Sequence, residues 1–167
     1  MKDFAGEIAR IKRLYNSAWQ YNWGAVPMTD AEFDALAKDL KPVVDPRLVL
    51  IAEHQGEPVG FSLSLPDLNV PLKYNRRGTL LGGLFQMLWR KKEIKLVRII
   101  VLGIIPEKLK TGAGTLLLYE TGRRGIEAGY PFGEASWVLE DNVMMNRAAE
   151  FMNGKRTKTY RLYETPL

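Results

Sequence analysis

Helical periodicity dominates the first forty residues. Apolar residues recur at intervals of three or four over about residues 4–20, which predicts an amphipathic helix. Thr29 and Glu32 have the spacing of a capping box ahead of a second apolar series, which we expect to stop at Pro42. The chain before Pro46 is therefore predicted to be helical, and a first strand would be short, absent or supplied by a partner.

Runs of strand-forming residues follow. Residues 96–105 are almost all aliphatic, which predicts a strand buried on both faces at the centre of a sheet. The turn residues Gln55 and Gly56 separate two apolar runs, which is the pattern of an antiparallel hairpin. Besides the central strand, four segments have strand character, at 48–53, 58–65, 132–139 and 158–163.

Three helical patterns lie between these strands. Residues 113–128 and a short segment at 145–152 carry apolar residues at helical spacing. Residues 79–89 are also apolar and helical in pattern, and they run into the basic cluster 90–92. This last helix either packs on its own domain, or lies on a membrane or lines a groove for an apolar ligand.

The order of elements predicts an α/β (α+β) fold with antiparallel and parallel strand pairs in one sheet. A chain of 167 residues without linker composition is expected to form a single domain over residues 1–167. One half of a longer two-domain arrangement remains an alternative.

Composition removes several kinds of chemistry. The chain has no cysteine, which excludes disulfides, thiolate nucleophiles and thiolate metal sites. His54 is the one histidine and is expected to be a solvated residue at a strand end, so we predict no metal site. The net charge of +5 suits an anionic ligand, a nucleic acid or a lipid surface equally. No signal segment or membrane span is visible, and we expect a cytoplasmic protein.

The segment from Leu102 to Thr115 is the most informative. A buried strand leads through a basic loop into Gly112 and Gly114 at the start of a helix, so backbone N–H groups converge at the positive end of the helix. Side chains at the two glycines would hold a pyrophosphate away from the backbone, and Lys108 and Lys110 add charge at the rim. The segment lacks the Gly-Lys-Ser/Thr ending of a P-loop and the third glycine of a dinucleotide fingerprint.

These residues resemble the GNAT N-acetyltransferase family, whose coenzyme A motif is a strand followed by Gln/Arg-x-x-Gly-x-Gly/Ala at a helix start. Gly112 and Gly114 match the two small positions, whereas Leu109 stands where the family has Gln or Arg. Asn146 to Ala149 looks like the family's Asn-x-x-Ala helix.

The resemblance implies a single GNAT-like domain with a mixed, mostly antiparallel sheet, helices on both faces, and a central parallel strand pair that splays to bind coenzyme A. It implies that backbone at the splayed end pairs with the pantetheine chain, at Leu102, Ile104 and Ile105. Around the pyrophosphate it implies Leu109, Lys110, Thr111, Gly112, Ala113, Gly114 and Thr115. Asn142 and Asn146 are further coenzyme-binding candidates.

Acyl transfer without a covalent intermediate needs a base for the amine and an acid for the leaving thiolate. Glu140 is the candidate base, directly or through water, although the cluster that it forms with Asp141 and Asn142 also has the character of a helix cap. The family's usual acid, a tyrosine on the following helix, is absent. Tyr160 or Tyr163 is the candidate replacement, and packing on a sheet is the alternative role.

The leading hypothesis is an N-acyltransferase, most simply an N-acetyltransferase, that uses acetyl-CoA or another acyl-CoA and no metal. The acceptor is expected to be a small-molecule or peptide amine, with no nucleic acid and no membrane as partner, and a homodimer is left open. A catalytically silent acyl-CoA-binding or regulatory module is the second hypothesis, and a membrane-associated protein acting through residues 79–92 is the third. The four tryptophans either line an acyl or acceptor pocket or form core, at Trp19, Trp23, Trp89 and Trp137.

Overall fold

The structure is a computed structural model that describes residues 4–20 and 25–165, with side chains from residue 6 onward. Contacts divide the chain into two compact units, Met1–Ser136 and Trp137–Leu167. The first unit holds the sheet and most helices, and the second holds one helix and the C-terminal segment. Each unit is described by itself below, and the expected single domain over the whole chain stays a prediction.

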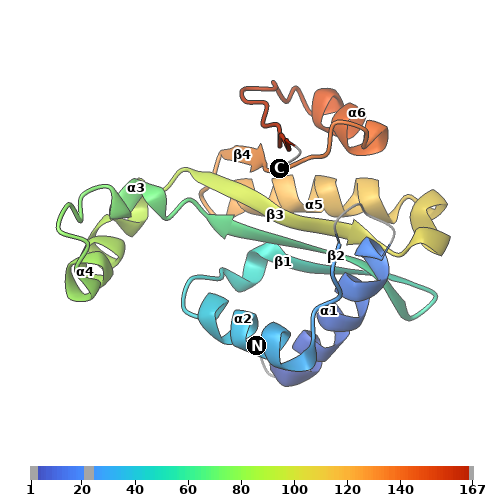
Figure 1. The fold of residues 1–167 in the computed structure, drawn as a ribbon, viewed down its shortest axis with the longest axis horizontal. Helices are drawn as coiled ribbons and strands as arrows, with labels where there is room; N and C mark the ends of the chain where they lie inside the picture. Colours follow the sequence, from blue (N-terminus) through green and yellow to red (C-terminus); the bar gives the residue numbers. More distant parts are fainter. Residues whose placement is uncertain (1–3, 21–24, 166–167) are drawn as a thin grey trace. The chain divides into compact units, whose positions relative to one another are not determined.

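The first unit is built on a four-stranded sheet with the order β1-β2-β3-β4 (Figure 1). The strands are β1 (Val49–His54), β2 (Glu57–Pro66), β3 (Leu96–Ile104) and β4 (Phe132–Ala135). The first three pair antiparallel and β4 pairs parallel with β3, so the predicted hairpin, central strand and mixed pairing are confirmed. The predicted run at 132–139 is wrong in length, because the strand ends at Ala135.

Helices α1 (Phe4–Trp19) and α5 (Ala113–Glu127) cover the two faces of this sheet. On one face, the buried Ser62 Oγ of β2 lies 3.0 Å from Thr121 Oγ1 of α5. The adjacent residue, Phe61, points to the other face, where its ring lies 6.0 Å from that of Trp19 in α1. Helices on both faces are therefore confirmed.

The remaining elements of this unit are short. Helix α2 (Asp30–Leu40) begins at the predicted capping box, in which the side chains of Thr29 and Glu32 bond to each other's backbone N–H groups. The 3₁₀ segments are the single turns η1 (Pro46–Leu48) and η2 (Lys91–Glu93) and the six-residue η3 (Pro106–Thr111). Helices α3 (Asn69–Leu72) and α4 (Leu80–Arg90) form an arm between β2 and β3 (Figure 1).

The second unit contains α6 (Val143–Phe151), which confirms the last predicted helix. Asn142 caps it, since its side-chain oxygen accepts a hydrogen bond from the Met145 N–H at 3.1 Å. The predicted strand at 158–163 is wrong, because these residues form no strand and are exposed. An alternating segment becomes a strand only beside another strand that accepts its backbone hydrogen bonds, and this unit has none in its described residues.

Candidate active site

The candidate site begins where β3 loses one of its two neighbours. Strand β4 pairs with β3 only from Leu96 to Ile99. Immediately afterwards the β2 register shifts, since Ser64 faces Ile99 and Leu63 faces Val101, which leaves Ile100 as the extra residue of a β-bulge. Beyond the bulge β3 pairs with β2 alone, so within the described residues its other edge is open.

Hydrogen bonds show which backbone groups face this open edge. The Ile105 N–H donates to the Val59 carbonyl of β2 at 2.9 Å, and backbone direction alternates along a strand. The N–H and C=O groups of Leu102 and Ile104 therefore point to the open edge, where they are free to pair with an added chain. Ile105 differs, because its carbonyl also accepts a hydrogen bond from the Lys108 N–H at 2.9 Å, so both of its backbone groups are engaged.

The open edge leads directly to the N-terminus of α5. After η3, Gly112 adopts the left-handed conformation with φ of 81° and caps α5 without any side-chain hydrogen bond. Thr111 fixes the turn, since its hydroxyl donates to the Lys108 carbonyl at 2.7 Å. The N–H groups of Gly114 and Thr115 lie in the first turn, where a helix offers no internal acceptor. These groups and the helix dipole make an anion cradle.

The two glycines act differently in this cradle. The backbone conformation requires Gly112, because its φ lies in the region that residues with a side chain disfavour. Packing does not require it, since a Cβ added there would meet nothing within 4 Å. A Cβ at Gly114 would make only an ordinary contact of 3.5 Å with Ile104 Cγ1. Packing inside the protein therefore demands neither glycine, and the space before them is open to a ligand.

The rim of the cradle contains both charged and apolar side chains. Lys110 is exposed and Lys108 is half-buried, so both are available near an anion. Leu109 is 62% exposed and has no hydrogen-bonding group where the GNAT motif has Gln or Arg. Thr111, Ala113 and Thr115 line the same turn. Backbone N–H groups therefore carry most of the recognition that this turn can offer.

Aromatic residues pack beneath the open part of β3, on the α1 face. A Cβ at Gly103 would lie 2.2 Å from the Trp19 ring, so this glycine permits the close approach of α1. Tyr15 stacks on Trp19 at 5.0 Å between ring centroids. Of the other tryptophans, Trp89 and Trp137 are 73% and 90% exposed and belong to neither core nor pocket, and Trp23 lies outside the described residues.

The predicted catalytic residues belong to the second unit. Glu140 forms an exposed ion pair with Arg161 at 3.0 Å, and Tyr160 is 76% exposed. Asn146 Nδ2 donates to the Asn142 carbonyl at 2.9 Å, so these two candidates are brought together at the start of α6. Within this unit they stabilise the beginning of the helix.

Two charged residues in the last paired part of β3 and β4, just before the open edge, were not predicted from the sequence. Arg98 of β3 forms an ion pair with Glu134 of β4 at 3.0 Å, and its Nε is buried without a hydrogen-bond partner in the described structure. Ser136 follows β4 and its hydroxyl donates to the Ile99 carbonyl at 3.3 Å, beside the bulge. The sequence could have indicated them, because each is the single charged residue within an otherwise uncharged run with strand character. In the structure the two residues are paired across neighbouring strands.

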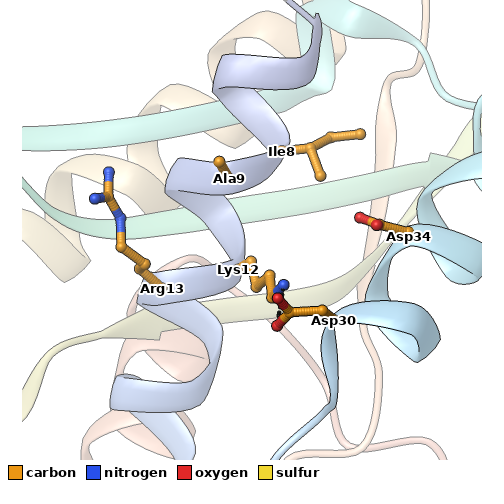
Figure 2. Close-up of a pocket in the computed structure, with 6 residues that line it drawn as sticks. All are labelled: Ile8, Ala9, Lys12, Arg13, Asp30 and Asp34. Carbon is orange, nitrogen blue, oxygen red and sulfur yellow. Dashed lines mark ion pairs between the residues drawn. The ribbon is translucent and has the colours of Figure 1, made fainter.

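Two surface hollows lie elsewhere and do not have the electrostatics of a phosphate site. One, of about 430 Å³, lies between α1 and α2, and there Lys12 forms an ion pair with Asp30, while Arg13 and Asp34 add one charge of each sign (Figure 2). The other, of about 280 Å³, has arginines that are already paired with carboxylates. There the hydrogen bond from Arg123 lowers the pKa of Glu120 to about 2.

In residues 4–20 and 25–165 no group of three or more His, Asp or Glu side chains is placed to hold a metal ion. No helix in that part of the chain is long and apolar enough to cross a membrane.

No family model matches the chain. It is 36% identical over 173 aligned residues to the bacterial ceramide synthase of Caulobacter vibrioides, an alignment that covers 100% of this chain and 45% of that protein. It is 34% identical over 171 residues to protein YghO of Escherichia coli, covering 96% of this chain and 43% of that protein. The chain thus spans less than half the length of these relatives.

Solved structures of acetyltransferases superpose over nearly the whole chain. The aminoglycoside N-acetyltransferase AAC(6')-Iy, in complex with CoA, aligns with a TM-score of 0.61 and 12% identity over 97% of this chain and 90% of that one. A putative acetyltransferase from Agrobacterium tumefaciens aligns with a TM-score of 0.61 and 15% identity over 96% of this chain and 94% of that one. The chain has the GNAT N-acetyltransferase fold that the resemblance in sequence implied.

Proposed function

We propose that the chain binds an acyl-CoA along the open edge of β3 and transfers its acyl group to a primary amine. One observation carries the proposal: the open backbone of Leu102 and Ile104 leads straight into the N-terminal N–H groups of α5, behind the left-handed Gly112. An extended amide-containing chain ending in a pyrophosphate matches both features, because strand edges pair with amides and helix N-termini bind phosphates.

In this reaction the amine nitrogen attacks the thioester carbonyl, the C–S bond breaks, and the thiolate takes up a proton. The protein must therefore accept a proton from the amine and supply one to sulfur. Glu134 lies on β4 opposite Arg98, in the last paired part of β3 before the open edge begins, and Arg98 holds it in place. Glu140 stays the alternative base and Tyr160 the proposed acid, both from the second unit.

The names of the relatives suggest a class of acceptor. A ceramide is the amide of a fatty acid with a long-chain amino alcohol, so a ceramide synthase forms the same bond that we propose here. We propose an amine on a long-chain lipid as acceptor, in preference to a peptide amine. The printed name of the second relative gives no chemistry.

Thermal stabilisation by acyl-CoA tests the binding step, because a ligand of the folded state raises the melting temperature. Acetyl-CoA and a long-chain acyl-CoA should each raise the Tm of the wild-type chain, and Gly112→Leu should abolish the rise. Gly129→Leu is the matched control, since Gly129 has φ of 93°, lies beyond the other end of α5, and also has open space around it. No rise with either thioester would refute coenzyme binding, and a full rise in Gly112→Leu would refute this placement of the cradle.

Release of free CoA thiol in the presence of amines separates an enzyme from a silent binding module. A long-chain amino alcohol should support faster release than short polar amines. Glu134→Gln and Glu140→Gln should be compared at saturating acyl-CoA, and the true base should lower kcat with little change in the thermal shift. Binding without thiol release from any amine would support the silent module instead.

A further inference from the structure

The α3–α4 arm, residues 67–95, presents an unusual surface. Six large apolar side chains of α4 are exposed, with exposed fractions from 53% to 89%: Leu80, Leu81, Leu84, Phe85, Leu88 and Trp89. At 100° per residue they occupy one half of the helix. Of the alternatives given for this helix, packing of its apolar face on its own domain is therefore wrong.

The inward side of α4 explains this orientation. Gly83 is buried, and a Cβ there would lie 3.1 Å from Asn75 Nδ2 and 3.6 Å from Leu72 Cδ2. Asn75 Nδ2 also donates to the Thr79 carbonyl at 2.8 Å, which fixes the start of the helix on the arm. The helix thus turns its glycines inward and its leucines outward, the reverse of a helix that covers a core.

Charge on the arm has one sign along most of its length. From Leu68 to Lys92 there are six basic residues and no acidic one, and this segment alone exceeds the net charge of +5 of the whole chain. The basic residues lie at both ends of α4: Lys73, Arg76, Arg77, Arg90, Lys91 and Lys92. In the described structure Arg76, Arg77 and Lys92 form no ion pair, so their charge is directed to solvent.

We infer that α4 docks on an anionic lipid bilayer, with its apolar face in the acyl region and the flanking cations at the head groups. An apolar half with Leu, Phe and Trp and basic residues beside it is the pattern of an interfacial helix. At 11 residues α4 is too short to span a bilayer, so it would lie in the plane of the interface. This binding needs neither coenzyme nor catalysis and goes beyond the proposed function.

Flotation with vesicles tests this inference. The wild-type chain should float with vesicles of phosphatidylcholine mixed with phosphatidylglycerol, and less with phosphatidylcholine alone or at high salt. Leu84→Gln/Leu88→Gln should lower the partition coefficient about tenfold or more, because the apolar contact is lost while charge and helix propensity are kept. Arg76→Gln/Arg77→Gln should weaken binding to the anionic vesicles only.

Tyr119→Gln/Ile126→Gln is the matched control, since these α5 side chains are similarly exposed at 62% and 65%. It should bind vesicles like the wild type, and all variants should unfold at the same urea concentration. Failure of the wild type to float, or equal flotation of Leu84→Gln/Leu88→Gln, overturns the inference. So does self-association through α4 in sedimentation that vesicles do not reverse, because a second copy would then be the occupant. Vesicle binding and the acyl-CoA thermal shift can each fail without the other.

Discussion

Strand β3 and helix α4 are similarly apolar in sequence and lie a few residues apart, yet the fold covers most of the strand and leaves the apolar face of the helix exposed. Strand β3 has β2 along one edge, β4 along the first part of the other edge, and α1 and α5 on its faces, so Val97 and Ile104 are 4% and 8% exposed. Helix α4 packs within its own arm and shows its leucines to solvent. An apolar run is thus buried only where the fold supplies cover, and an uncovered run with flanking cations indicates a partner outside the chain.

Side-chain truncation should give the largest difference in the free energy of unfolding between β3 and α4. Ile104→Ala should lower the free energy of unfolding by about 2–5 kcal/mol, because it leaves a cavity against α5. Leu80→Ala, at a residue 89% exposed, should change it by no more than about 0.5 kcal/mol. Urea unfolding measures both. A loss of more than about 2 kcal/mol for Leu80→Ala would mean that α4 is covered after all.

Added side-chain volume on the α1 side of β3 should destabilise the fold. Gly103→Ala brings a Cβ within 2.2 Å of the Trp19 ring, and such overpacking should cost about 1–3 kcal/mol. Gly133→Ala on the neighbouring β4 is the control, since a Cβ there meets nothing within 4 Å. Urea midpoints of the two variants should differ, and equal midpoints would show that α1 does not approach β3 this closely.

The α5 side of the sheet depends on a buried hydrogen bond between Ser62 and Thr121. Thr121→Val should cost about 1 kcal/mol, because the hydroxyl pair is lost in a site without solvent. Ser62→Ala should cost a similar amount, and the double variant should cost less than the two single changes together. Strict additivity in this double-mutant cycle would argue against the contact.

The smallest effect concerns pH. Burial raises the pKa of Tyr130, which packs with Val97 at the start of β3. A raised folded-state pKa gives stability that is complete below the unfolded value of about 10 and is lost as the pH rises through the folded value. Tyr130→Phe should therefore flatten the decline of urea midpoints above about pH 10. An unchanged slope would mean that Tyr130 is solvated.

Several elements could be predicted from local sequence because local rules decide them. The Thr29–Glu32 capping box, the hairpin at Gln55 and Gly56, and the turn at Gly112 each depend on a few adjacent residues. The strand predicted at 158–163 fails for the opposite reason, since a strand needs a neighbour that alternation alone does not reveal. The pairing of Arg98 with Glu134 could not be predicted from local sequence, because only the β3–β4 register places the two residues side by side.

The sequence by itself determined the strand, turn and helix that make the cradle, because φ at Gly112 and the N–H groups of α5 are fixed within a few residues. Only the tertiary structure decided where β3 is left open, since the bulge at Ile100 and the early end of β4 are properties of strand pairing. It also decided that α4 faces solvent, because burial depends on the elements that surround a helix as well as on its own residues.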